Sequence, residues 1–392
     1  MLSTRLKQLR LARGLSLDEL AAKMGGIVTK QALSKYELGT AQPTPVVLNK
    51  LAAALGVKAS YFWSEPAVKV EFVAYRRKST LPKREQEKVE SLVIRTLEER
   101  LKILSLISRD EKIEIPVKKW KVKKLEDVDQ AAAELREQWE LGMEPIANLV
   151  GTLEARWIQV IEIDADERFD GISAIASDVR ENVVSGAAVV TRRGISRDRQ
   201  RFSLAHELGH IVLAPSKDID EEKAAHRFGA ALLAPADAVR REVGPRRTLV
   251  QAEELFLLKK RYGMSIQAFV RRLLELGIIN DSHYKQWVMD ISRLGWRKEE
   301  PGELPPEQPQ WFRQQVLRLF TEKVITKEAA ETVLDESIED GVPLSLIERR
   351  AFMKLPLVER RRIMQAQAEK LLDLYEDDAE RQDWQGGDII EQ

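Results

Sequence analysis

The crowding of histidines in one stretch constrains the fold of this chain more than any other feature. The chain has four histidines in 392 residues, and three of them lie between Arg197 and Pro235. His206 and His210 enclose Glu207 in the pattern H-E-x-x-H, and residues four apart lie on one face of a helix. Two imidazoles on one face can hold one divalent metal ion. We therefore expect a helix here, with further ligands facing it.

A catalytic zinc site usually has three protein ligands and one open position, so the two histidines need a partner. An amphipathic helix is predicted after the motif, and its first acidic residues are Glu221 and Glu222. We predict Glu222 as the third ligand. His226 lies one turn further on the same face and is predicted to orient a ligand, with direct metal binding as the alternative. The predicted cofactor is one Zn²⁺ per chain, although two imidazoles and a carboxylate also suit Mn²⁺ or Fe²⁺.

The central carboxylate of the motif determines its chemistry. In metallopeptidases with this pattern, the carboxylate takes a proton from a water that the metal has activated, and the resulting hydroxide attacks a peptide carbonyl. Glu207 is therefore the predicted catalytic residue. The alternative is that both histidines are ordinary residues of a packed helix. Spacing alone also does not decide whether a metal site turns over substrate.

The segment RDRQRFSLAHELGHIVL, followed by EEKAAHRFGAALLAP, resembles the ImmA/IrrE family of bacterial zinc-dependent peptidases. Members of that family resemble minimal zincins and cleave transcriptional repressors. The resemblance implies His206 and His210 as metal ligands, Glu207 as general base, and Glu222 of an E-x-x-A segment as third ligand. The chain departs from the family at His226, where Asn or Asp is common. This departure affects the hydrogen bond expected behind a metal ligand.

Residues 1–64 have the pattern of a small all-α domain. Ser16 and Glu19 fit a capping box, Gly25 and Gly26 permit a sharp turn, and Thr29 is placed to cap the next helix. The predicted helices cover Ser3–Arg13, Ser16–Met24, Thr29–Leu38 and Pro45–Leu55. Nine Lys or Arg against three Asp or Glu make this part basic, although the whole chain has no net charge.

Two short helices joined by a glycine turn form a helix-turn-helix, whose second helix enters the major groove of DNA. In that helix Gln31 could read adenine, and a lysine could read guanine or contact a phosphate. The predicted DNA-contacting residues are Thr29, Lys30, Gln31, Ser34 and Lys35. This segment resembles the lambda-repressor-like, xenobiotic-response-element (XRE) type of domain, which implies double-stranded DNA as partner. The alternative is a four-helix packing module that does not bind DNA.

Residues 65–128 are predicted to form a helical connector, because residues 85–106 carry apolar side chains at near-heptad spacing. This helix is expected to connect two domains or to pair with a second copy of the chain as a homodimer. Residues 129–298 are predicted to form a zincin-like metallopeptidase domain with a helical extension. Within it, the runs Trp157–Ile163, Gly171–Ala176 and Ala187–Val190 have strand character. Such a small sheet could bind an extended substrate as a further strand.

The C-terminal quarter begins with PGELPPEQP, whose prolines mark residues 299–310 as a linker. Residues 311–392 are predicted to be a helical, antitoxin-like region. The segment RRAFMKLPLVERRRIMQAQAEKLLDLYEDDAERQDWQGGDIIEQ resembles the C-terminal portion of small bacterial antitoxin-like proteins. This resemblance implies a toxin as a candidate partner held by an amphipathic helix, and a solvated tail is the alternative.

Composition limits the class of protein. Hydrophobic residues at 44% and charged residues at 32% indicate apolar cores together with long solvated helices, and the length suggests two or three domains. No run matches a membrane span or a signal peptide, and the absence of cysteine excludes disulfides and thiolate metal sites. We therefore expect a cytoplasmic, multidomain protein without a membrane partner. It should be mainly α, with an α+β zincin-like core and an all-α helix-turn-helix.

Two functions agree with these features. The first is a transcriptional regulator and zinc-dependent peptidase, which binds DNA and hydrolyses a peptide bond in a specific protein, expected to be a repressor. The second is an antitoxin-like DNA-binding repressor of a toxin–antitoxin operon, in which the C-terminal helices bind a toxin and the zinc fold has little or no catalysis. The intact Glu207 distinguishes them, since a scaffold does not need it.

Overall fold

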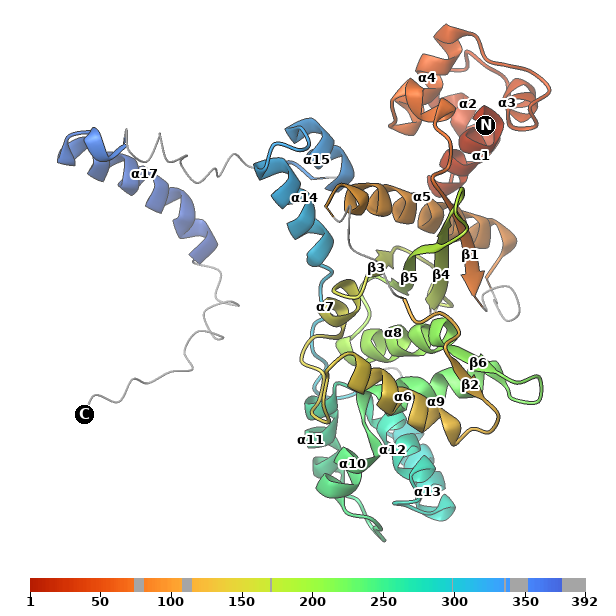
Figure 1. Cartoon of the computed structure of the whole chain (residues 1–392), viewed down its shortest axis with the longest axis vertical. Coiled ribbons are helices and arrows are strands. Elements are labelled where there is room, and N and C mark those ends of the chain that lie inside the picture. Colours follow the sequence, from red (N-terminus) through yellow and green to blue (C-terminus); the bar gives the residue numbers. More distant parts are fainter. Residues whose placement is uncertain are drawn as a thin grey trace. The chain divides into compact units, whose positions relative to one another are not determined.

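The structure, a computed structural model, describes residues 1–73, 81–107, 115–169, 171–297, 299–334, 336–338 and 352–375. The chain divides into two compact units, Met1–Leu334 and Asp335–Gln392. The long helix of the second unit is α17 (Leu357–Tyr375), and the other labelled elements in Figure 1 belong to the first unit. Among the described helices, none is both long and apolar enough to cross a bilayer.

The N-terminal part contains all four predicted helices. They are α1 (Leu2–Ala12), α2 (Leu17–Lys23), α3 (Lys30–Glu37) and α4 (Pro45–Leu55), followed by the 3-10 helix η1 (Ala59–Trp63). Ser16 and Glu19 form the predicted capping box, and the Thr29 side chain accepts a hydrogen bond from the Ala32 N–H. Leucines from all four helices pack around the buried Phe62. The predicted all-α domain is therefore confirmed.

Four strands form one mixed sheet in the order β1-β4-β5-β3. Their bounds are β1 (Val68–Val73), β3 (Ile158–Ile163), β4 (Gly171–Asp178) and β5 (Val184–Arg192). β4 is antiparallel to β1 and β5, whereas β3 is parallel to β5. The three predicted strands are present. β1 was not expected, because it lies in the segment predicted as a helical connector and its partner strand is about a hundred residues away in the sequence.

Helices α5 (Lys83–Ile107) and α8 (Arg197–Val212) contact the sheet, whose alternate side chains point to opposite faces. Buried Val93, Leu97 and Leu104 of α5 share one apolar cluster with the sheet. α5 also packs against α1, where Arg5 and Glu98 form an ion pair. The long helix therefore connects the N-terminal domain to the sheet. Pairing of α5 with a second copy of the chain stays a prediction. The apolar face of α5 is already covered by the sheet of the same chain.

The remaining elements of the first unit lie around the sheet and α8, with α9 packed on α8 and α14 packed on α5 (Figure 1). They are β2 (Trp120–Val122), α6 (Asp127–Gln138), α7 (Leu149–Glu154), β6 (Leu213–Pro215), α9 (Glu221–Leu233), α10 (Ala236–Val243), α11 (Ala252–Tyr262), α12 (Ile266–Glu275), α13 (Asp281–Arg293), α14 (Trp311–Thr321) and α15 (Lys327–Leu334). β2 pairs in parallel with β6. Ser265 caps α12 as predicted, since its side chain accepts from the Ala268 N–H.

The segment predicted as a proline-rich linker is fixed to the fold by two buried glutamates. Glu300 is 6% exposed and Glu307 is 8% exposed. The Glu307 carboxylate accepts a hydrogen bond of 2.9 Å from the Val150 N–H and pairs with Arg197 and Arg201. The prolines disfavour a helix in this segment, but the segment is still attached to the fold by the contacts of its glutamates. Residues 299–310 therefore differ from the linker that their composition indicates.

Helices α14 and α15 continue the first unit instead of beginning a separate C-terminal region. The Arg100 guanidinium lies 4.9 Å from the centre of the buried Phe312 ring. The Trp311 ring contacts Trp157, with 5.8 Å between ring centroids. The two units divide after Leu334 and not at residue 311. Of the segment that resembles antitoxins, residues 349–351 and 376–392 lie outside the described residues.

Candidate metal centre

Two helices that approach closely at glycine residues build the site. α8 carries the H-E-x-x-H motif and α9 carries the predicted third ligand. A Cβ atom at Gly209 would lie 3.1 Å from the Ala225 Cα, and one at Gly229 would lie 3.1 Å from the His206 backbone nitrogen. Larger residues at these positions would push the helices apart. A glycine on each helix therefore allows α9 to lie directly against the histidine face of α8.

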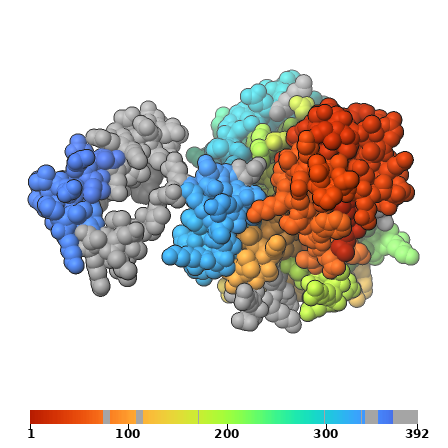
Figure 2. Space-filling model, turned by 90° about the horizontal axis from the view of Figure 1, so that it is seen from above, coloured from red at the N-terminus to blue at the C-terminus, as the bar shows by residue number. Residues whose placement is uncertain are grey.

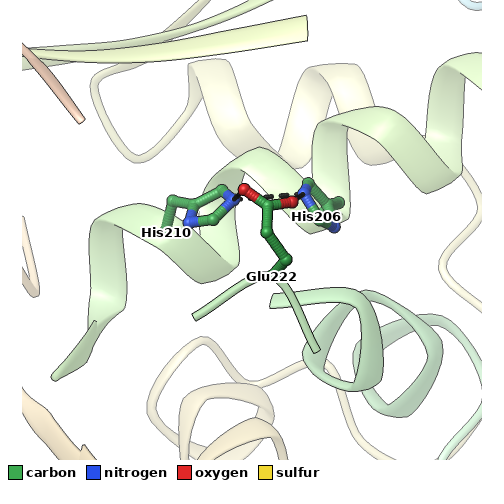
Figure 3. Close-up of side chains that lie close together, drawn as sticks. All are labelled: His206, His210 and Glu222. Carbon is green, nitrogen blue, oxygen red and sulfur yellow. Dashed lines mark hydrogen bonds and ion pairs between the residues drawn. The ribbon is translucent and has the colours of Figure 1, made fainter. Parts of the chain in front are cut away.

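The first turn of α9 is fixed by Asp220, whose carboxylate accepts hydrogen bonds from the N–H groups of Glu222 and Lys223. From this turn the Glu222 carboxylate points toward both imidazoles (Figure 3). Its Oε2 lies 3.5 Å from His206 Nε2, and its Oε1 lies 3.7 Å from His210 Nε2. The two Nε2 atoms are 3.1 Å apart. The structure thus brings the three predicted ligands together.

These separations fit one metal ion. Ligand atoms bonded to tetrahedral zinc at about 2.0–2.1 Å lie about 3.3 Å from one another. The two Nε2 atoms are 3.1 Å apart, the separations of 3.5 and 3.7 Å are made by the two different oxygens of Glu222, and one ligand atom from each residue lies within 4.8 Å of the others. Two imidazole nitrogens and a carboxylate that face one another also form a donor set suited to a divalent cation. Among the residues that the structure describes, this is the one group of three His or acidic side chains with such convergence.

The centre is closed on one side and open on the other. The side chain of His210 is 5% exposed, that of His206 is 19% exposed and that of Glu222 is 36% exposed. His206 and Glu222 also line a cavity of about 780 Å³. A substrate carbonyl could therefore approach from the side of these two residues.

Lys118 supports the closed side of the site. Its ammonium donates a hydrogen bond of 2.7 Å to the His210 carbonyl oxygen, and its backbone N–H donates to the Ile211 carbonyl oxygen. Burial lowers the pKa of Lys118. Its backbone is left-handed, with φ of 49°, a conformation that costs a residue with a Cβ atom some strain. Sequence reasoning missed this contact, because nothing local marks a lysine ninety-two residues before the ligand.

Glu207 lies against the start of β4. Its side chain is buried, with 8% of the residue exposed. A Cβ atom at Gly171 would lie 3.0 Å from the Glu207 Oε1 atom, so glycine at this position leaves room for the carboxylate. The sequence predicted the residue from its place in the motif. Its contact with the sheet comes from the tertiary fold.

His226 lies beside the centre and is not part of the group of three. Its ring centroid is 4.7 Å from that of Phe202 and 6.5 Å from that of His206. Burial lowers the pKa of His226, and the nearby Glu275 carboxylate only partly opposes this shift. The ring is therefore a half-buried part of the cavity wall, and burial favours its uncharged form.

The predicted DNA-contacting residues lie together on α3 and its N-cap. Thr29, Lys30, Gln31 and Lys35 are exposed and Ser34 is half-buried. The Lys30 ammonium lies 2.6 Å from the Asp18 carboxylate in an exposed ion pair, which is a weak interaction in water. Leu33 anchors the helix in the core. Figure 2 shows the N-terminal residues, red to orange, as one continuous exposed surface.

Comparison with protein families agrees with both parts of this description. Residues 6–62 match the family model described as "Helix-turn-helix". Residues 189–274, which include the H-E-x-x-H motif, match the model described as "IrrE N-terminal-like domain". No curated protein matches the chain. The chain therefore combines a segment similar to helix-turn-helix domains of the XRE type with a segment similar to metallopeptidase-type domains of the IrrE-like family.

Proposed function

We propose that this chain is a DNA-binding regulator whose IrrE-like domain hydrolyses a peptide bond in a specific protein. A transcriptional repressor is the first candidate substrate. The convergence of His206, His210 and Glu222 carries the proposal. Zinc is the proposed metal, with one ion per chain, because two imidazoles and one carboxylate would leave one position of a tetrahedral zinc open.

His206, His210 and Glu222 would hold the metal ion, which would supply a Lewis acid able to polarise a substrate carbonyl and to lower the pKa of water to about 7. Glu207 is the proposed general base, which accepts the proton of the attacking water. Because Glu207 is buried against β4, its electrostatic interactions are stronger than in bulk water. The substrate is proposed to enter from the open side, past His206 and Glu222.

The edge of the sheet leaves little room for an added substrate strand. β1 already pairs with residues Ser173 to Asp178 of β4. Beyond this described pairing, β4 offers only Gly171 and Ile172 next to Glu207. We therefore propose that the cavity beside His206 receives most of the substrate, and that strand pairing is confined to the first residues of β4.

Metal binding is tested by mass spectrometry of three purified proteins. They are the wild type, the His206→Ala, His210→Ala double variant, and Glu221→Gln. Glu221 is the exposed neighbour of the proposed ligand Glu222 and serves as matched control. About one equivalent of zinc in the wild type and the control, lost in the double variant, supports the site. Equal zinc in all three proteins would contradict it.

Catalysis is tested by comparing new protein N-termini in cells that express the wild type or Glu207→Gln. We expect at least one cleaved protein with the wild type alone. Glu207→Gln should retain zinc and should shift DNA in a gel as the wild type does. If Glu207→Gln cleaves at the wild-type rate, the proposed mechanism is wrong.

An antitoxin-like repressor is the second candidate function, favoured by exposed apolar side chains on α17. Leu357, Val358 and Met364 are 56%, 80% and 59% exposed. Such side chains on a helix can dock in the groove of a partner such as a toxin, and the metal domain would then act as scaffold. Deletion of residues 335–392 should release a co-purifying partner without loss of zinc. Unchanged co-purification would count against this function.

A further inference from the structure

The cavity beside the metal centre runs along one face of α8. This wall is formed by Asp198, Arg199, Phe202, Ser203 and His206. They recur at intervals of three or four residues, as expected for one helix face. Asp198 and His206 are eight residues apart, which is a distance of about 12 Å along a helix. The cavity therefore joins the metal centre to an aspartate at its far end.

Asp198 is a buried carboxylate with incomplete pairing. The residue is 5% exposed. Its Oδ1 has no hydrogen-bond partner in the part of the chain that the structure describes. Its Oδ2 lies 3.5 Å from the Lys259 ammonium, which is longer than a charge-assisted hydrogen bond of about 2.7–2.9 Å.

The Lys259 ammonium is engaged mainly by another carboxylate. It lies 2.9 Å from Glu300 Oε2. Glu300 also accepts hydrogen bonds from the N–H groups of Ile266 and Gln267, in the first turn of α12. The cluster of Asp198, Lys259 and Glu300 thus contains two carboxylates and one ammonium. A buried carboxylate whose hydrogen-bonding capacity is not filled, such as that of Asp198, favours the binding of a further cation.

The other cationic side chains of the cavity wall do not neutralise the Asp198 carboxylate. Arg227 pairs with Asp129, and Arg271 pairs with Glu275. Arg199 and Lys223 have exposed side chains, and Arg192 is half-buried. The Arg199 guanidinium donates a hydrogen bond to the Arg297 carbonyl oxygen. Asp198 therefore keeps an acceptor oxygen that no cation of the wall satisfies.

An apolar surface lies between Asp198 and the metal centre. The rings of Phe202 and His226 pack against each other with centroids 4.7 Å apart, and both line the cavity. Aromatic faces accept the aliphatic stem of a long basic side chain, and they also attract its charged end. The cavity thus combines a surface for the stem with an acceptor for the charge.

We propose that this end of the cavity is a subsite for a lysine or arginine side chain of the protein substrate, and that Asp198 selects it. The proposal rests on the proposed peptidase function. Asp198 and His206 are separated by about 12 Å along the helix axis, so a long side chain of a substrate residue bound near His206 approaches Asp198 better than a short one. Lysine and arginine carry their charge on flexible stems, and either can bring a donor to the Asp198 carboxylate, whose buried Oδ1 has no hydrogen-bond partner among the described residues.

Two small ligands test the subsite directly. N-acetyl-lysine hydroxamate and N-acetyl-norleucine hydroxamate share the metal-binding group and the four-carbon stem, and only the lysine compound carries a charge on it. We expect zinc-loaded wild-type protein to bind the lysine compound at least about tenfold more tightly by calorimetry, a difference of about 1.4 kcal/mol. Equal affinity of the two compounds for the wild type would overturn the proposal.

Variants assign the selectivity to one residue. Asp198→Asn should bind both hydroxamates with the affinity that the wild type has for the norleucine compound. Glu167→Gln is the matched control, because Glu167 is an exposed carboxylate of the same cavity, and it should keep the tenfold preference. Preference retained in Asp198→Asn would overturn the proposal. If Asp198→Asn does not fold, the affinities of the two hydroxamates for the wild-type protein decide whether the subsite selects a cation.

Failure of the metal centre gives a different result. If neither hydroxamate binds, the proposed metal function is contradicted. The subsite is then decided by N-acetyl-lysine methylamide and N-acetyl-norleucine methylamide, whose binding to metal-free protein is measured by ligand-observed NMR. Binding of the lysine compound alone, lost in Asp198→Asn, supports the subsite. Equal signals from both compounds, or none from either, would overturn it.

Discussion

Replacing Glu307 with alanine should destabilise the first unit far more than a substitution at an exposed position nearby. The Glu307 carboxylate accepts from the Val150 N–H and pairs with Arg197 and Arg201, and the Arg201 side chain is 2% exposed. Removing one partner of a buried ion pair costs about 3–5 kcal/mol, because the other charge stays buried. Arg201 keeps its hydrogen bond to the Ile146 carbonyl oxygen. We therefore expect the lower end of this range, about 3 kcal/mol.

Urea unfolding of the full-length chain, followed by circular dichroism, measures this loss. Glu307→Gln keeps an acceptor for the Val150 N–H without the charge, so its free energy of unfolding should fall by about 1.5–2 kcal/mol. Glu303→Ala is the matched control, since Glu303 is exposed in the same segment, and it should change stability by less than about 0.5 kcal/mol. A loss below about 1 kcal/mol for Glu307→Ala would refute the reasoning, and residues 299–310 would then be a linker after all.

Three further predictions concern the helices around the metal centre. Gly229→Ala places a Cβ atom 3.1 Å from the His206 backbone nitrogen; thermal unfolding should show a loss of about 1–3 kcal/mol, and mass spectrometry should show less zinc. Lys118→Met removes the hydrogen bond to His210 and should cost about 1 kcal/mol, with weaker zinc retention against a chelator; unchanged retention would contradict the supporting role. The pKa of His226 lies below its usual 6.5, so the unfolded chain binds the proton more readily. Stability should therefore fall as pH drops below 6.5, and urea unfolding at pH 8 and pH 5.5 should show a smaller fall in His226→Gln.

Local signals explain why the N-terminal domain could be predicted closely. The reciprocal hydrogen bonds of Ser16 and Glu19 involve residues three apart. Thr29 caps α3 in the same local way, and Gly14 ends the first helix with φ of 67°. Each of these choices is made within one helical turn, so sequence spacing is enough to infer it.

The candidate metal centre was partly predictable for the same reason. His206 and His210 lie four apart on one helix, and Glu222 follows an aspartate that caps the next helix. Spacing indicates which residues can share a metal. It does not indicate how closely the helices approach, which depends on the small residues Gly209 and Gly229. The close approach that these two glycines allow is a property of the packed helices α8 and α9, and sequence spacing does not reveal it.

Contacts between distant segments explain what the sequence did not predict. Sequence alone predicts a connector at β1, because an edge strand of six residues is stabilised only beside its partner, β4. Proline content predicts a linker at residues 299–310, whereas the buried ion pair of Glu307 with Arg201 joins residues 106 positions apart in the sequence. Composition describes a segment in isolation and therefore does not reveal a buried partner elsewhere.

The burial of α8 on several sides joins these observations. Near its start, Gln200 and Arg201 hold the segment around Glu307. Further along, Glu207 lies against the sheet and Gly209 against α9. A helix buried on several sides does not show a simple apolar stripe, so the spacing of H-E-x-x-H is more informative than hydrophobic periodicity. Because each of these supports comes from a different part of the chain, a change at a distant position such as Glu307 should also weaken metal binding.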